Sequence, residues 1–305
     1  MNAQRSNWLG YYLLVGSVWG CSFLFIALGN KFLTPVGVGF WRQFLGGVPM
    51  LVLALIGRKR FPRDPRAWFY VFCVSLFMNS APSALFAFAE QHVTSGFAGI
   101  MNATTPIATI LMILTFFREE KPTATVLTGL AVGLVGVLTV LSVWNGLGSN
   151  DPAAVLALCG ASLLYGIGGP FSRRYVGKLG LEPQVQVPMQ ILMAAGTLAP
   201  FYLTGPLTTA TPTLAGVIGM LVLGVLGTGF AYIWYYRLMA LAGSAIANSV
   251  TYMSPVVAVL AGSLLLHESA TWNQLVGGLV VILGAAISQG RLSGLVSKFS
   301  GSSNG

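Results

Sequence analysis

The side chains that could bind or act on another molecule are few in this sequence, and they lie inside long apolar runs. Each polar group in such a run costs free energy unless it faces a cavity or a partner helix. We therefore predict a neutral, polar and aromatic binding site for a small molecule, with hydrogen bonds between helices as the alternative role of each residue. The candidate substrate-binding residues are Trp19, Ser22, Gln43, Asn79, Ser83, Asn102, Tyr165, Gln190, Thr228, Asn248 and Tyr252.

Groupings that would support catalysis or metal binding do not occur in these runs. The seven acidic residues lie at or near the ends of the runs or between them, and the two histidines, His92 and His267, are in different halves of the chain. An enzyme would need a nucleophile with a base, paired carboxylates or a metal cluster. The three cysteines form no metal or disulfide pattern. We therefore predict that the protein is not an enzyme and uses no metal or cofactor.

The same residues bear on the energy source. No phosphate-binding G-x-x-x-x-G-K-[ST] loop occurs, so ATP is not predicted to be the direct energy source. Proton exchange usually needs a carboxylate within the membrane. We predict instead that Glu119, Glu120 and Glu268 cap helices or pair at the membrane interface. The sequence therefore favours movement of a substrate down its own gradient.

The elements that position these side chains follow from hydropathy. Of the 305 residues, 55% are hydrophobic and only 8% are charged, and the mean hydropathy is +0.78, whereas soluble proteins carry about 25% charged residues. A helix of about 20 apolar residues crosses the hydrocarbon core of a bilayer. We predict an all-α integral membrane protein with ten spans, at residues 8–28, 35–56, 67–88, 94–117, 123–143, 153–175, 184–203, 213–236, 244–266 and 271–291.

The positive charges predict the orientation of these spans. With a cytoplasmic N-terminus, all of the 16 Lys and Arg residues except Lys31 and Arg42 fall on the cytoplasmic side. Both termini are then cytoplasmic, and the net charge of +9 needs no nucleic-acid partner. Arg42 lies inside the second span. We expect it to pair with Glu90 or to reach the interface, with binding of a substrate carboxylate as the alternative.

An internal repeat is visible at a separation of 149 positions. Because each half would hold five spans, an odd number, the second half would enter the membrane the opposite way round, as in many secondary transporters. We predict repeats at residues 1–148 and 149–292 and a flexible tail at residues 293–305. The pairs at this separation include Pro106 and Pro255, Glu119 and Glu268, Gly129 and Gly278, Asn79 and Thr228, and Asn102 and Thr251.

Several spans contain residues that permit a kink. Proline removes a backbone donor, and glycine adds freedom. These positions are plausible hinges, and fixed bends are the alternative. The predicted hinge residues are Pro82, Pro106, Pro188, Gly227, Gly229 and Pro255.

Two stretches of the chain carry a family resemblance. They run from Thr105-Pro106 through Phe117-Arg118-Glu119-Glu120 and from Ser254-Pro255 through His267-Glu268, and glycines follow each of them. Trp19-Gly20 and Phe40-Trp41-Arg42 fit the start of the same pattern. With these motifs, the chain resembles EamA-type transporters of the drug/metabolite transporter superfamily over about residues 8–291, and it is most similar to the bacterial amino-acid exporter branch.

The resemblance implies a ten-helix carrier of small metabolites in a bacterial inner membrane. The predicted function is therefore secondary transport of small metabolites, most simply aromatic or other neutral amino acids, outward through a central cavity between the repeats. The predicted partners are a small-molecule substrate and the lipid bilayer. A passive channel, or an exporter of drugs or other metabolites with the same fold, is the alternative.

Overall fold

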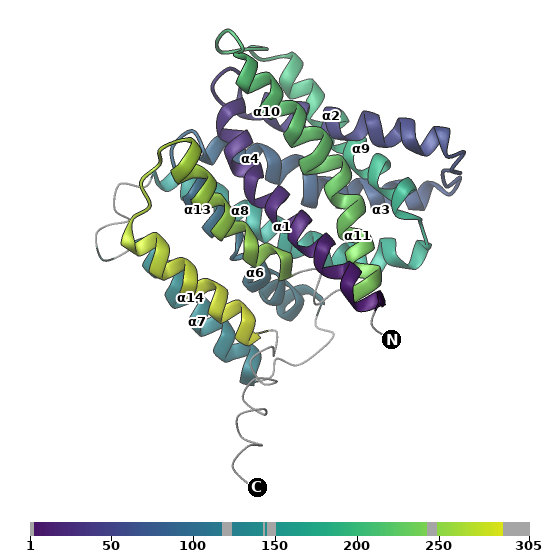
Figure 1. The fold of residues 1–305 in the computed structure, drawn as a ribbon. Coiled ribbons are helices and arrows are strands. Elements are labelled where there is room, and N and C mark those ends of the chain that lie inside the picture. The colour runs from purple at the N-terminus through teal and green to yellow at the C-terminus, as the bar shows by residue number, and fades with distance from the viewer. Residues whose placement is uncertain (1–2, 118–123, 143, 145–150, 243–248, 289–305) are drawn as a thin grey trace, which may run out of the picture.

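The computed structural model describes residues 3–117, 124–142, 144, 151–242 and 249–288, and the regular structure within them is helical (Figure 1). Each of the ten predicted spans contains at least one helix. The first half has α1 (Ala3–Gly29), α2 (Pro35–Ile56), α3 (Pro65–Ser75), η1 (Leu76–Ser80), α4 (Ala81–Ala89), α5 (Ser95–Asn102), α6 (Thr105–Met112), η2 (Ile113–Phe117) and α7 (Ala124–Val140). The second half has α8 (Pro152–Phe171), η4 (Ser172–Val176), η5 (Gly177–Leu179), α9 (Pro183–Leu203), α10 (Leu214–Gly224), η6 (Val225–Phe230), α11 (Ala231–Ala242), η7 (Ser249–Tyr252), α13 (Met253–Leu265) and α14 (Trp272–Ser288).

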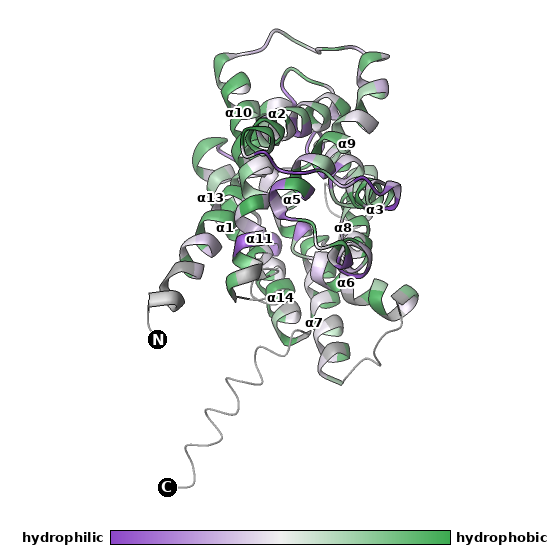
Figure 2. Ribbon diagram, turned by 90° about the vertical axis from the view of Figure 1, so that its right-hand side faces the viewer, coloured by the Kyte–Doolittle hydropathy of each residue, from purple (hydrophilic) through white to green (hydrophobic). Residues whose placement is uncertain are grey.

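The lengths and surfaces of these helices fit a multi-pass membrane protein. By length and composition, five helical segments within the described residues can cross a bilayer: Trp8–Gly29, Pro35–Ile56, Pro65–Ala89, Pro152–Leu179 and Leu214–Leu238. Shorter apolar helices include Leu127–Val140, Met253–Leu265 and Trp272–Gly284. Most of the helical ribbon is hydrophobic in Figure 2, and side chains such as Ile56 and Leu214 are about three-quarters exposed, as expected where lipid is the solvent. The count of ten spans and the orientation of the termini stay predictions.

Two helical segments contain a π-helical turn at equivalent positions of the two halves. The first turn is η1, between α3 and α4, and the second is η6, between α10 and α11. Their first residues, Leu76 and Val225, are separated by the same 149 positions as the sequence repeat. Such turns often occur at functional sites, because the wider turn displaces side chains from the regular helical face. Asn79 lies in η1 and Thr228 in η6.

The contact between α7 and α14 joins the last long helix of each half, and the two helices lie side by side in Figure 1. Glycines make this close approach possible. A Cβ atom on Gly277 would lie 2.6 Å from the backbone nitrogen of Val140, and one on Gly136 would lie 2.5 Å from that of Val281. The backbones are therefore in direct contact across the two halves.

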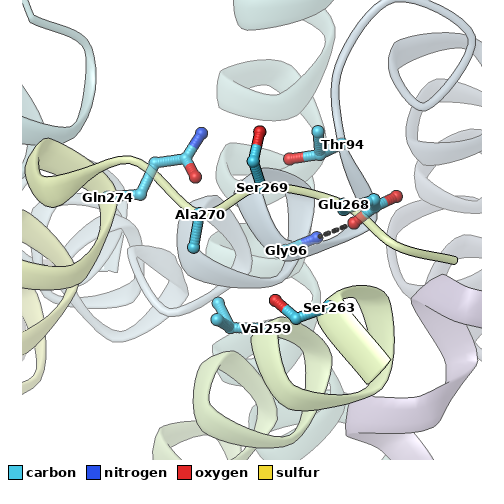
Figure 3. Close-up of a pocket in the computed structure, with 8 residues that line it drawn as sticks. All are labelled: Thr94, Gly96, Val259, Ser263, Glu268, Ser269, Ala270 and Gln274. Atoms are coloured by element: carbon cyan, nitrogen blue, oxygen red, sulfur yellow. Dashed lines mark hydrogen bonds between the residues drawn. The ribbon is translucent and has the colours of Figure 1, made fainter. Parts of the chain in front are cut away.

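Glu268 caps the beginning of α5 from the other half of the chain, as Figure 3 shows. Its Oε1 accepts a hydrogen bond from the backbone N–H of Ser95 at 3.0 Å. Its Oε2 accepts one from the Ser95 hydroxyl at 2.7 Å and one from the Gly96 N–H at 3.3 Å. A carboxylate at this position satisfies N–H groups that have no partner within the helix. The prediction that Glu268 caps a helix is confirmed; Glu119 and Glu120 lie outside the described residues.

Replacing Glu268 with alanine should destabilise the protein by about 1–3 kcal/mol, because Ser95 is buried and its donors would lose their acceptor. Thermal melting in detergent measures the effect. The control is Glu182→Ala, which removes an exposed ion pair to Lys59 and should cost no more than about 1 kcal/mol. Equal melting temperatures for the two variants would contradict the capping role.

Candidate functional site

Asn79 lies at the centre of a buried amide cluster that joins four helical segments. Its Oδ1 accepts a hydrogen bond from Gln190 Nε2 of α9 at 2.6 Å. Its Nδ2 donates to Gln43 Oε1 of α2 at 3.4 Å and to the hydroxyl of Tyr232 of α11 at 3.5 Å. Gln43 Nε2 in turn donates to the backbone carbonyl of Asn79 at 3.3 Å. Gln43, Asn79 and Gln190 are only 1–2% exposed, so their amide groups bond to one another rather than to solvent.

Arg42, the neighbour of Gln43 on α2, reaches the other π-helical turn. Its Nε donates to Thr228 Oγ1 at 2.9 Å, and the Thr228 hydroxyl donates to the Leu223 carbonyl at 3.0 Å. The backbones approach closely here, since a Cβ on Gly46 would lie 2.6 Å from the Gly224 carbonyl oxygen. Two successive residues of α2 thus bind the two equivalent positions of the halves, Asn79 and Thr228.

The predicted ion pair between Arg42 and Glu90 is wrong. Both residues are described, and the ion pairs among the described residues are Lys59 with Glu182 and His92 with Asp151. Arg42 and Glu90 interact electrostatically at longer range. The physical reason is that the Arg42 side chain is directed toward η6 by its bond to Thr228.

Aromatic rings adjoin the amide cluster on one side. The Trp19 ring of α1 lies 5.8 Å from the Tyr232 ring and 5.2 Å from the Tyr235 ring, measured between centroids. Tyr236 follows at 6.4 Å from Tyr232, and its hydroxyl accepts a hydrogen bond from Gln186 Nε2 at 2.9 Å. These rings offer flat surfaces next to neutral hydrogen-bonding groups.

Among the described side chains, the other predicted site residues are not joined to this cluster by hydrogen bonds. The hydroxyls of Ser22 and Ser83 are buried and donate to carbonyls of their own helical segments, at Val18 and Ser80. Tyr165 stacks on Phe86 at 6.1 Å, and Asn102 ends α5. Asn248 and the side chain of Tyr252 lie outside the described part of the structure.

The predicted hinge residues lie at local changes of helical geometry, with one exception. Gly227 and Gly229 are within η6, and Pro82 is the second residue of α4, which follows η1. Pro106 is the second residue of α6, which begins after the break that follows α5, and Pro255 is the third residue of α13, which follows the 3₁₀ helix η7. Pro188 lies inside the unbroken helix α9. Whether any of these positions moves stays a prediction.

Three functional candidates are not among the predicted substrate-binding residues: Tyr232, Arg42, which was given a substrate carboxylate only as its alternative partner, and Glu90. Tyr232 is separated from Ser83 by 149 positions, so the repeat could have identified it. Arg42 was assigned to a structural pair, and nothing in its own spacing points to Thr228. Glu90 is buried although it directly follows a helix end, where an acid would ordinarily reach water.

Some buried polar atoms of the described residues have no hydrogen-bond partner. They include Gln190 Oε1 in the amide cluster, and the hydroxyls of Thr105 and Ser254, which again are 149 positions apart. Buried polar groups are normally paired, so such atoms need an explanation, and a bound molecule is one. Gln190 Oε1 lies on α9 in the amide cluster, whereas the two hydroxyls belong to α6 and α13.

The fold and this cluster define a class: a multi-pass helical membrane protein with a buried polar cluster between its two halves. The family model of the EamA-like transporter family matches residues 6–142 and again residues 152–289. The chain belongs to this family and is a membrane transporter.

Similar proteins agree with this assignment. The chain is 28% identical over 250 residues to the uncharacterized inner membrane transporter YedA of Escherichia coli (strain K12). The matched residues make up 81% of this chain and 78% of YedA. It is 26% identical over 272 residues to the uncharacterized transporter YoaV of Bacillus subtilis (strain 168), covering 88% and 91% of the two chains. A protein crystal structure matches this chain with a TM-score of 0.66 at 16% identity, and the match covers 93% of this chain and 98% of the chain in that structure. This likeness shows the fold alone.

Proposed function

We propose that the protein is a secondary transporter of small metabolites that works by alternating access between two inverted repeats. The observation that carries the proposal is the bridge from α2: Gln43 contacts Asn79 and Arg42 contacts Thr228. The two partners occupy equivalent positions of the sequence repeat. Inverted repeats can exchange conformations, which opens a shared site first to one side and then to the other.

The chemistry of the site supports an amino acid as the substrate. A zwitterion needs a donor for its carboxylate and acceptors for its ammonium group, and Arg42 and Gln190 Oε1 provide one of each. The Trp19 and Tyr235 rings offer a flat surface for an apolar or aromatic side chain. This proposal agrees with the resemblance to the amino-acid exporter branch that includes YddG. By analogy with YedA, we place the protein in the inner membrane. Export as the direction rests on the resemblance to the exporter branch alone.

Transport by purified protein in liposomes tests the proposal. The vesicles receive a mixture of amino acids and other metabolites, and mass spectrometry reports what enters. We expect neutral amino acids to enter at saturable rates and to exchange with unlabelled substrate inside. If only other metabolites enter, the amino-acid assignment is wrong while carrier function stands. Flux that never saturates and shows no exchange would favour a passive channel.

A further inference from the structure

Glu90 is a buried acid without a partner at the end of α4. The residue is 8% exposed, and neither of its carboxylate oxygens has a hydrogen-bond partner. A buried charge that is neither paired nor hydrogen-bonded is very costly, so such a group normally becomes neutral. The carboxyl group therefore requires a proton or a cation that the described side chains do not provide.

The turn that contains Glu90 has a counterpart of the same length between α1 and α2. The chain turns from α4 to α5 through Glu90 and the cap Thr94, and from α1 to α2 through Asn30 and the cap Thr34, with the same spacing. Asn30 Nδ2 donates to the Ala87 carbonyl, one turn before Glu90, at 2.7 Å. Asn30 Oδ1 is buried without a partner. This junction of α1 and α4 therefore contains three acceptor oxygens that lack a donor.

Charged and titratable groups lie on several of the elements around Glu90. Arg42 lies on α2, Tyr165 on α8, and Glu268 between α13 and α14, while the element η1 contributes none. Beyond α1 the exposed Lys31 follows Asn30, and in the same turn as Glu90 the side chain of His92 pairs with Asp151 at 3.5 Å.

The electrostatics favour the neutral form of the acid. Burial raises the pKa of Glu90 well above its usual range, the nearby charge of Glu268 raises it further, and Arg42 opposes both effects. A protonated carboxyl group becomes a donor as well as an acceptor. A proton would thus remove the charge and supply the donor that the junction lacks.

We propose that Glu90 is a proton-binding site that couples proton movement to transport, an inference that rests on the proposed carrier function. In the conformation described here, the α1–α4 junction is closed over the protonated acid. Opening of the junction would admit water, which hydrates the carboxylate and takes the proton. The proton comes from water on one side of the membrane and returns to water on the other, with no other bond made or broken. Substrate movement need not then follow its own gradient alone, in contrast to the prediction from the sequence.

A transport assay separates coupling from carrier function. Proteoliposomes in sodium-free buffer receive a mixture of amino acids, with a pH gradient imposed and the membrane potential clamped by potassium and valinomycin. With one proton exchanged per substrate, a gradient of one pH unit, acidic inside, should raise the accumulated substrate about tenfold. Glu90→Gln should lose this accumulation while substrate still exchanges, whereas Glu182→Gln should behave as the native protein does.

A second measurement does not depend on transport. Because the folded state binds the Glu90 proton more tightly than the unfolded state, melting temperature in detergent should fall as pH rises from the ordinary carboxylate range to the raised pKa. Glu90→Gln should be free of that decrease. Parallel melting curves for the two proteins overturn the proposal. So does exchange that ignores the pH gradient, or that responds to sodium at constant pH; loss of all exchange in the native protein instead overturns the proposed function.

Discussion

Transport by an Asn79→Leu variant is expected to fall by at least about 100-fold, which corresponds to about 2.7 kcal/mol. Leucine has a similar size but neither donates nor accepts hydrogen bonds. The substitution would leave Gln43 Oε1 and Gln190 Nε2 without their partner, at about 1–3 kcal/mol for each group, while the bond from Gln43 Nε2 to the backbone carbonyl of residue 79 stays. It would also break the side-chain contact of α2 with η1, while the contact of α2 with η6 through Arg42 and Thr228 stays. Amino-acid exchange in proteoliposomes measures the loss.

The matched control is Ser75→Ala, about one turn before Asn79. Ser75 is fully buried, but its hydroxyl donates only to the Phe72 carbonyl of its own helix at 2.7 Å. We expect exchange within about twofold of the native rate, because one local hydrogen bond is worth about 1 kcal/mol or less of stability and reaches no other helix. A folded Asn79→Leu protein that exchanges as fast as this control would show that the amide cluster only holds the helices together.

The helices and their class could be predicted from the sequence because hydrocarbon imposes a simple pattern. A span needs a long apolar run, and the ends of such runs are marked by groups such as Thr34 and Asp151, which cap α2 and α8. The repeat also identified Asn79 and Thr228 as equivalent positions, and both lie in π-helical turns. The spans and the repeat follow from local composition and spacing, so no knowledge of packing was needed.

The contacts of the site depend on packing and could not be predicted in the same way. The π-helical turns η1 and η6 shift the side chains of Asn79 and Thr228 relative to a regular helix. Pro82, Gly227 and Gly229 predicted a kink near these turns, but no residue pattern predicted the wider turn itself. Arg42 turns toward Thr228 rather than Glu90, because the glycines at 46 and 224 let α2 approach η6. Glu90 in turn is buried by neighbours from distant parts of the chain.

The contact between the last helices of the two halves gives the second large effect. Gly277→Ala is expected to lower the melting temperature strongly and to reduce the yield of folded protein, at a cost of about 3 kcal/mol or more. The new Cβ would lie 2.6 Å from the backbone nitrogen of Val140 and 2.9 Å from the carbonyl oxygen of Gly136. Both are backbone atoms of α7, so no rotation of a side chain relieves the clash, and the helices must separate.

Gly278→Ala is the control, because it adds the same methyl group one position along α14. Its Cβ would lie 3.4 Å from the Ile100 side chain, an ordinary van der Waals contact. The two variants share helix propensity and composition, so a difference between their melting temperatures reports the α7–α14 contact alone. If both melt like the native protein, the helices are not packed backbone to backbone. If only Gly277→Ala melts early yet still exchanges substrate, the contact stabilises the two halves without taking part in their movement.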